Sequence, residues 1–539
     1  MAARQCRADT YPQIAAAGDR RVVSKRDRRT LCRRGGGPMS APATSKQSFT
    51  ARDVTTGEAI AEFTRMDADQ VAARIVECRV AGLIWQGMGF GRRRDCLMAW
   101  AADIVTHSDD FVSLIHRESG KPVDDAYMEL VIAVEHIRWA ARNAERVLRR
   151  RRVIPTVLMA NYRAVIDSEP FGVIGIISPW NYPLFAPVAP LASALAAGNG
   201  VALKPSEHTT AVGAELVASF ARANPSVPQD VLTLITGDGE AGAGLISGGV
   251  DKVAFTGSPR TARKILHACA DTLTPVVMEC GGKDAMIVAA DADVEAAADA
   301  AAWGGFSNAG QTCVGVERIY VHQAVSERFR KALGRRLRDV RVGTESGATY
   351  GPMMLASQAA TVAEQVRDAI GHGASAPLGG AERIRDRTGE PIVLVDPDES
   401  CAAVQEETFG PMVTVRTVAD LEEAVRLANG TNFGLGAAVF SKSDGPRLSA
   451  ALRCGMVSVN SVIAFVSIPE LPFGGVGESG YGRIHGAEGL REFSRTKSIS
   501  TKFADPPGLN GMLLQRPAFT MFALRAMTRA RFRAGRRSQ

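Results

Sequence analysis

The 539-residue sequence contains no C-x-x-C pair and no apolar run long enough to span a bilayer. Its nine cysteines are odd in number and scattered, which argues against a disulfide framework and against a cysteine-based zinc site. Unpaired thiols of this kind are typical of proteins in a reducing compartment. We therefore expect a cytoplasmic protein, and nothing in the chain implies a bound metal.

The body of the chain also lacks a net positive charge, although the net charge of the whole sequence is +7. Residues 1–38 contain ten Lys and Arg against three Asp, and residues 506–539 contain seven Arg and no acid, so each tail has a charge of +7. Subtracting both tails from the total leaves −7 for residues 39–505. A globular body of that sign is a poor binder of nucleic acid, so we expect no nucleic-acid partner.

The N-terminal tail, residues 1–38, allows two interpretations. It is rich in Arg like a mitochondrial presequence, but Asp9, Asp19 and Asp27 fit that class poorly. We favour a disordered basic extension, with Met39 as a natural start of the ordered protein.

The C-terminal tail, residues 506–539, also allows two interpretations. Residues 517–533 place Phe519, Phe522 and Met527 among arginines at roughly helical spacing. One interpretation is a basic amphipathic helix that makes weak contact with an anionic membrane surface. The other is a frayed or protein-docked terminus.

The length predicts two or more domains, because one core rarely serves so many residues. Short apolar runs bounded by turn residues alternate with helical segments, a pattern typical of parallel strands in a doubly wound α/β domain. The predicted strands are residues 171–177, 200–203, 231–235 and 252–255, followed in the second half by residues 317–322, 412–415 and 434–440. Residues 153–169 alternate loosely and predict a β-hairpin arm.

Two stretches have the composition of a covalent catalytic site. Cys313 ends the small, polar loop of residues 307–313, and Glu279 follows a predicted strand at residues 275–278. Glycines beside both permit the close backbone approach that such chemistry often needs. A small buried cysteine is the commoner case, so these stretches alone leave a structural and a catalytic role equally open.

Three motifs resemble those of the aldehyde dehydrogenase superfamily. They are residues 179–183 (PWNYP), 279–283 (ECGGK) and 306–313 (FSNAGQTC). The motifs are long and follow the family's order, and the resemblance extends from about Val54 to about Lys502. It implies the family's α/β fold.

The resemblance also implies a domain order. We expect an NAD-binding domain over residues 39–280, which includes the hairpin, and a catalytic domain over residues 281–471. Residues 472–505 are expected to return to the NAD-binding domain and to add a strand to the hairpin. In the family this arm builds oligomers, so we expect a homodimer or a homotetramer.

The resemblance implies roles for three catalytic residues. The Cys313 thiolate would attack the aldehyde to give a thiohemiacetal and then a thioester. The Asn181 side chain would stabilise the oxyanion together with the Cys313 N–H. Glu279 would activate the water that hydrolyses the thioester, and its presence favours hydrolysis over acyl transfer to a thiol such as coenzyme A.

The resemblance also implies that several residues contact the cofactor, which we predict to be NAD, with NADP as the alternative. They are Trp180, Lys204, Ser206, Glu207, Gly237, Gly257, Ser258, Glu407 and Phe409. The carboxylate of Glu207 can accept from ribose hydroxyls and would repel a 2′-phosphate, which favours NAD. Lys204 and Ser206 could still assist a phosphate. The G-x-G-x-x-G at residues 237–242 is a weak dinucleotide match, because no acid stands where the ribose carboxylate is expected.

The substrate is the least determined feature. Residues 278–284 and 314–318 resemble a divergent type of succinate-semialdehyde dehydrogenase, so succinate semialdehyde is the first prediction. However, Ser307 stands where the better-known type has the arginine that grips the substrate carboxylate. Residues 472–480 resemble the fatty and aromatic aldehyde branch, so a medium-chain or aromatic aldehyde is the alternative. A non-catalytic membrane-surface scaffold on the same fold is the alternative from another class.

Overall fold

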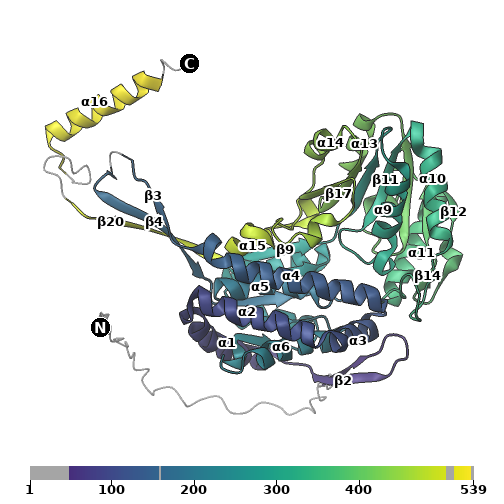
Figure 1. The fold of residues 1–539 in the computed structure, drawn as a ribbon, viewed down its shortest axis with the longest axis horizontal. Coiled ribbons are helices and arrows are strands. Elements are labelled where there is room, and N and C mark those ends of the chain that lie inside the picture. Colours follow the sequence, from purple (N-terminus) through teal and green to yellow (C-terminus); the bar gives the residue numbers. More distant parts are fainter. Residues whose placement is uncertain (1–47, 157–158, 505–514, 536–539) are drawn as a thin grey trace, which may run out of the picture. The chain divides into compact units, whose positions relative to one another are not determined.

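The computed structural model describes residues 48–156, 159–504 and 515–535 (Figure 1). The predicted extension at residues 1–38 and residues 505–514 of the C-terminal region lie outside the described residues. The first described elements are β1 (Ser48–Arg52) and β2 (Ala59–Thr64), which form an antiparallel hairpin. Four helices follow: α1 (Ala68–Gly87), α2 (Gly89–Thr106), α3 (Ser108–Ser119) and α4 (Val123–Leu148).

The boundaries of these helices follow from their capping residues. The Asp67 carboxylate accepts from the Gln70 N–H, 2.9 Å away, and begins α1. Gly120 ends α3 in the left-handed conformation (φ 73°), where glycine carries no steric penalty, and Pro122 stands just before α4. The chain between α3 and α4 therefore turns sharply, and Lys121 lies in this turn.

The first large sheet has six strands in the order β19-β9-β8-β5-β6-β7. Its strands are β5 (Val173–Ile177), β6 (Gly200–Lys204), β7 (Leu232–Leu234), β8 (Lys252–Gly257), β9 (Val276–Cys280) and β19 (Gly480–Tyr481). All are parallel except β19, which pairs antiparallel with β9. Helices α5 (Phe185–Ala197), α6 (Thr210–Ala223), α7 (Gly239–Ser247) and α8 (Pro259–Thr272) connect them.

The strand order of this sheet defines where a ligand can bind. The chain leaves β5 for β6 on one side and later returns to β8 on the other side. Such a reversal opens a crevice at the carboxyl ends of the strands, where ligands of doubly wound sheets bind. The five strands predicted for this sheet are all present, each within two residues of its predicted limits.

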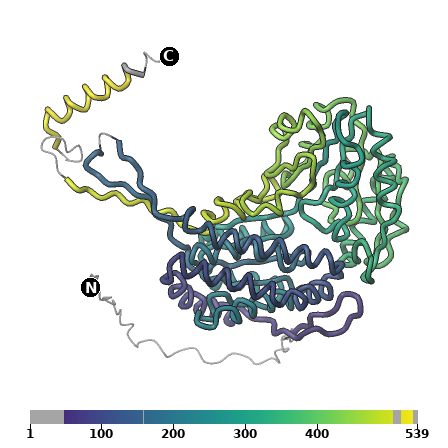
Figure 2. Tube along the Cα trace, viewed as in Figure 1, coloured from purple at the N-terminus to yellow at the C-terminus, as the bar shows by residue number. Residues whose placement is uncertain are grey.

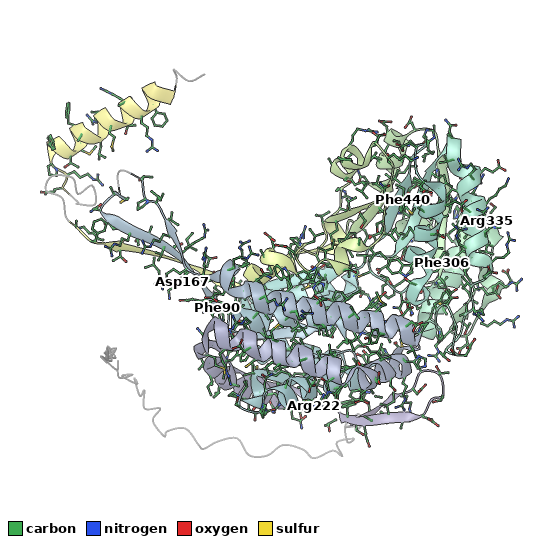
Figure 3. All side chains as sticks on the ribbon, in the orientation of Figure 1. Phe90, Asp167, Arg222, Phe306, Arg335 and Phe440 are labelled. Carbon is green, nitrogen blue, oxygen red and sulfur yellow. The ribbon has the colours of Figure 1, made fainter. Side chains whose placement is uncertain are left out.

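The second large sheet has seven strands in the order β12-β15-β16-β11-β10-β17-β18, with only β12 antiparallel to its neighbour. Its strands are β10 (Asp284–Val288), β11 (Val316–His322), β12 (Ser375–Leu378), β15 (Ile392–Val395), β16 (Met412–Val418), β17 (Gly436–Phe440) and β18 (Met456–Val459). Its helices are α9 (Val294–Phe306), α10 (Gln323–Arg338), α11 (Ala356–Gly371), α12 (Ala402–Gln405), α13 (Leu421–Ala428) and α14 (Gly445–Ala451). Phe306 and Phe440 are buried in its core, whereas Arg335 lies on the outer surface (Figure 3).

A third sheet of three strands forms the arm, in the order β20-β4-β3. Strands β3 (Arg151–Val153) and β4 (Tyr162–Pro170) make the hairpin, which begins two residues earlier than predicted. After α15 (Gly486–Glu492), strand β20 (Ser494–Lys502) runs antiparallel along the whole of β4 (Figure 2). Strand β20 therefore adds a third strand to the hairpin.

The C-terminal tail contains one further helix, α16 (Ala518–Gly535). Its bounds are close to residues 517–533, and a helix here leaves both interpretations of the tail open. Within the described ranges, no helix is long and apolar enough to cross a membrane.

Candidate active site

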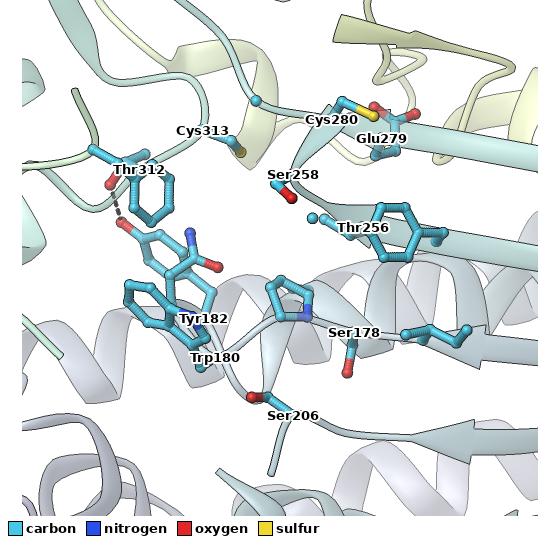
Figure 4. Close-up of a pocket in the computed structure, with 18 of the residues that line it drawn as sticks. Ser178, Trp180, Tyr182, Ser206, Thr256, Ser258, Glu279, Cys280, Thr312 and Cys313 are labelled. Atoms are coloured by element: carbon cyan, nitrogen blue, oxygen red, sulfur yellow. Dashed lines mark hydrogen bonds between the residues drawn. The ribbon is translucent and has the colours of Figure 1, made fainter. Parts of the chain in front are cut away.

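A cavity of about 1160 Å³ lies where the carboxyl ends of β5, β6, β8 and β9 face the loop that ends in Cys313 (Figure 4). Its wall includes all three predicted catalytic residues, Cys313, Glu279 and Asn181. It also includes most of the predicted cofactor residues: Trp180, Lys204, Ser206, Glu207, Gly257, Ser258, Glu407 and Phe409. The fold thus gathers residues from positions 180 to 409 around one space.

Gly237 is the predicted site residue that does not line this cavity, whereas Gly239 and Gly242 of the same motif do. Gly237 has φ 137°, and a Cβ there would lie 2.8 Å from the Ala241 Cβ. The tight turn into α7 therefore requires glycine at this position.

Cys313 follows a tightly wound segment. In the short 3-10 turn η3 (Ser307–Gly310), Asn308 and Ala309 both have positive φ angles, of 53° and 56°. A Cβ at Gly310 would lie only 2.0 Å from the Gly410 carbonyl oxygen, so only glycine fits there. Burial, followed by the carboxylates of Glu407 and Asp284, raises the pKa of the Cys313 thiol. These surroundings therefore favour the thiol over the thiolate.

The Asn181 side chain is buried and linked to the same loop. Its Nδ2 donates to the Gln311 backbone carbonyl oxygen (3.0 Å), and the Asn181 backbone carbonyl oxygen accepts from Asn308 Nδ2 (3.1 Å). Close by, the Tyr182 hydroxyl lies 2.8 Å from Thr312 Oγ1 (Figure 4). These bonds hold the turn after β5 against the segment that precedes Cys313.

The buried ion pair of Lys121 and Glu129 stabilises this turn. Lys121 Nζ pairs with the Glu129 carboxylate and donates to the Asn181 carbonyl oxygen at 3.1 Å. The other Glu129 oxygen accepts from the N–H groups of Leu184 (2.8 Å) and Phe185 (3.0 Å). Glu129 was not predicted from the sequence, because an acid within a helical pattern looks like a surface residue.

Glu279 lies at the end of β9 and is only 3% exposed. Neither of its carboxyl oxygens has a hydrogen-bond partner among the described residues. Burial raises its pKa well above the ordinary value for glutamate, and Arg483 opposes the effect only in part. An unpaired carboxyl group in a cavity wall, with a raised pKa, has the properties of a general base.

The loop that contains Glu407 and Phe409 comes from the second sheet. Glu317 holds it by accepting from the N–H groups of Thr408 (2.9 Å) and Phe409 (3.0 Å). Glu407 Oε1 accepts from the Gly282 N–H (3.1 Å), and burial raises the pKa of Glu407 to about 8. The Phe409 ring stands edge-on to Trp180 at 5.6 Å, so the two sheets contact each other across the cavity.

The opposite end of the cavity is formed by the ends of β6 and β8. Lys204 Nζ donates to the Pro205 carbonyl oxygen (3.0 Å) and lies 3.8 Å from the Glu207 carboxylate. Ser258 caps α8 by accepting from the Thr261 N–H, so the positive end of this 14-residue helix begins in the cavity wall. Such a helix terminus favours a phosphate group.

Comparisons with known proteins agree with this architecture. Residues 41–499 match the model of the aldehyde dehydrogenase family. A 4,4'-diapolycopene aldehyde oxidase from Methylomonas is 38% identical, covering 79% of this chain and 80% of its own. A putative succinate-semialdehyde dehydrogenase [NADP(+)] from Mycolicibacterium smegmatis is 34% identical, with coverages of 88% and 93%.

A solved structure, that of an NAD-dependent aldehyde dehydrogenase from Sinorhizobium meliloti, superimposes with a TM-score of 0.81 at 31% identity, covering 87% of this chain and 94% of that one. The fold and the family model together define an oxidoreductase that acts on aldehydes. The chain belongs to the aldehyde dehydrogenase family.

Proposed function

We propose that the protein oxidises an aldehyde to a carboxylic acid by NAD(P)-dependent, non-acylating chemistry through a thioester on Cys313. The observation that carries the proposal is the presence of Cys313 and of an unpaired Glu279 carboxyl group in the wall of one cavity. A nucleophile alone would suit acyl transfer to a thiol, whereas the additional base supports hydrolysis.

The reaction requires three steps. The Cys313 thiol releases its proton, and the thiolate adds to the aldehyde carbon. The resulting oxyanion is stabilised by the Asn181 amide and the Cys313 N–H. Loss of hydride from that carbon converts the thiohemiacetal into a thioester. Glu279 then takes a proton from water as the water attacks the thioester, which releases the acid and returns the thiolate.

The residues at the β6 and β8 ends fit a nicotinamide dinucleotide, which when bound accepts the hydride. The N-terminus of α8 would hold the pyrophosphate, and Lys204 and Glu207 would hold the adenosine ribose. Glu207 supports NAD, because its carboxylate would repel a 2′-phosphate. Lys204 keeps NADP as the alternative, since its ammonium could bind that phosphate.

The cavity wall supports an apolar aldehyde over succinate semialdehyde. Elements α4, α5 and residues 463–485 contribute mainly apolar side chains to it: Met128, Ile132, Phe185, Ile463, Val466 and Phe473. Among the described residues of these segments, no Lys or Arg lines the cavity, and Asp125 would repel a carboxylate. The medium-chain or aromatic aldehyde is therefore the better supported substrate, which agrees with the apolar substrate in the name of the Methylomonas relative.

Turnover of a panel of aldehydes tests the proposal. NADH and NADPH absorbance would be followed with succinate semialdehyde, medium-chain aldehydes and aromatic aldehydes, on the parent and on Cys313→Ala. We expect turnover of apolar aldehydes that is absent in the variant. No turnover of any aldehyde by folded, reduced protein would contradict the proposal and favour the scaffold alternative.

Three further expectations belong to this proposal. The seven described cysteines are all free, which supports a reducing, cytoplasmic location. The arm supports a homodimer or homotetramer.

The tail helix α16 combines arginines with exposed Phe519, Phe522 and Phe532, which supports weak contact with an anionic membrane. Deleting residues 506–539 should abolish binding to anionic vesicles and leave turnover unchanged, whereas unchanged vesicle binding would contradict the role of the tail.

A further inference from the structure

A buried histidine with unsatisfied ring nitrogens forms part of the cavity wall. His485 is 3% exposed, and neither its Nδ1 nor its Nε2 has a hydrogen-bond partner among the described residues. The neighbouring His136 differs, because its Nε2 lies 3.0 Å from the Val466 carbonyl oxygen. Buried polar groups in native proteins nearly always have partners, so an unpaired imidazole at a cavity wall requires an explanation.

The backbone of His485 is strained as well. Its φ of 64° and ψ of 166° fall in a region that is almost restricted to glycine. Ile484 exchanges two backbone hydrogen bonds with Phe473 (2.7 and 2.9 Å), and the Gly486 N–H donates to the Pro469 carbonyl oxygen (2.9 Å). A Cβ at Gly486 would lie 2.6 Å from the Glu470 carbonyl oxygen, so the chain cannot relax on that side. The fold therefore holds a strained histidine in this wall.

Aromatic rings fix the orientation of the imidazole. The ring centroids of His136, Phe473 and Phe185 lie 4.1, 5.4 and 5.7 Å from that of His485. Burial lowers the pKa of His485 well below its usual range, and His136 adds to this effect. The imidazole is therefore neutral, with one donor and one acceptor nitrogen.

A neutral imidazole in an apolar wall selects a particular kind of ligand group. A carboxylate would have to give up its hydration there without a cation to compensate for its charge. A hydroxyl or a carbonyl oxygen gives up less hydration and satisfies one ring nitrogen. The reacting carbonyl of the aldehyde already has Asn181 and the Cys313 N–H assigned to it, so His485 would serve a second oxygen.

We propose that His485 is a specificity-determining residue that hydrogen-bonds a neutral oxygen on the otherwise apolar body of the aldehyde. The preferred substrates would then be apolar aldehydes that have a second hydroxyl or carbonyl group. This inference rests on the proposed function, because it concerns the substrate of the same cavity.

Matched pairs of aldehydes test the inference. Each pair is a straight-chain alkanal and the same alkanal with one hydroxyl group, with the hydroxyl moved along the chain from pair to pair. The variant His485→Phe keeps an aromatic ring without its nitrogens, and His485→Gln keeps a donor and an acceptor. We expect the parent to prefer at least one hydroxyalkanal, and His485→Phe to lower kcat/KM for that substrate alone by about tenfold, the size expected for one unmade hydrogen bond. His485→Gln should recover part of the loss.

Two outcomes separate this inference from the proposed function. Turnover of alkanals without any hydroxyl preference, or an equal loss on both members of a pair, would overturn the role of His485 but leave the proposed function intact. Absence of all turnover would overturn the proposed function itself.

Poor folding of His485→Phe is covered by a second measurement. The ¹⁵N resonances of the His485 imidazole would be recorded in Cys313→Ala, which cannot react, as the preferred hydroxyalkanal and then its unsubstituted partner are added. A shift with the hydroxyalkanal alone supports the inference. Identical responses to the two compounds would overturn it.

Discussion

The ammonium group of Lys121 donates a hydrogen bond to the backbone carbonyl oxygen of Asn181 at a distance of 3.1 Å, inside the protein. The same ammonium pairs with Glu129 and lies 4.0 Å from the centre of the Tyr182 ring. The turn that presents the proposed oxyanion donor therefore rests on a buried charge, and the stability of the fold is coupled to the geometry of the site.

Replacing Lys121 by methionine should destabilise the protein by about 3–5 kcal/mol, because the Glu129 carboxylate is left buried without its counter-charge. Turnover of the folded fraction should also fall, since the Asn181 turn loses a support. The double variant Lys121→Met/Glu129→Gln should recover much of the stability, because glutamine is neutral and can still accept from the Leu184 N–H. Urea unfolding measures the free energy of unfolding of the parent, the single variant and the double variant. An equal loss of this free energy in the single and double variants would contradict the account.

The buried Glu407 predicts a dependence of stability on pH. Its folded-state pKa of about 8 exceeds the ordinary value of 4.5, so between these values the folded protein holds a proton that the unfolded chain has released. Its contribution to stability is therefore complete below about pH 4.5 and is lost as the pH rises toward 8. Glutamine at this position does not titrate. Thermal unfolding should therefore show a smaller drop in Tm between pH 5 and pH 8 for Glu407→Gln than for the parent. The exposed neighbour Glu406→Gln is the control, and a Glu407→Gln profile parallel to that of the parent would argue against this assignment.

Cofactor preference should depend on Glu207. Replacing its carboxylate by an amide in Glu207→Gln removes the repulsion of a 2′-phosphate, and we expect kcat/KM for NADP relative to NAD to rise on the order of tenfold. Glu240→Gln is a suitable control, because Glu240 is exposed in the first turn of α7 and does not line the cavity. An unchanged ratio in Glu207→Gln would mean that this acid does not face the ribose.

The exposed arm predicts an assembly in solution. Ile154 follows β3 and is 94% exposed, an unusual position for a large apolar side chain that the other described residues leave uncovered. We expect light scattering to show a dimer or tetramer for the parent and a smaller species for Ile154→Asp. Ile370→Asp, at an exposed apolar position on α11, serves as the control. A monomeric parent would contradict this prediction.

Local patterns were sufficient to predict several of the strands, whereas β10, β12, β15 and β18 were not predicted and the strand order came from the structure. Short apolar runs bounded by turn residues mark buried parallel strands, and this is why β5, β6, β7 and β8 were found from the sequence. Motif resemblance brought Cys313, Glu279 and Asn181 together as candidates before any geometry was known. The structure adds that all three line one cavity.

The supporting residues were harder to predict, because their roles arise from contacts between distant segments. Glu129 and Glu317 each accept from backbone N–H groups more than fifty positions away. Glu129 stands beside no motif, and although Glu317 lies in the stretch 314–318, that resemblance gave it no role. Gly237 was predicted to contact the cofactor, and the structure adds that its turn into α7 requires glycine. His485 has no sequence signal at all, since only its burial and its unpaired nitrogens distinguish it from a surface histidine.

The central claim is that Cys313 forms a thioester which Glu279 hydrolyses, and trapping that thioester tests it most directly. Glu279→Gln would be mixed with an apolar aldehyde and oxidised dinucleotide, and the intact mass and its peptide location would be measured. We predict one acyl group per active site, located on Cys313, together with a burst of reduced cofactor and little further turnover. Undiminished steady-state turnover by Glu279→Gln, or an acyl group on a residue other than Cys313, would contradict the account.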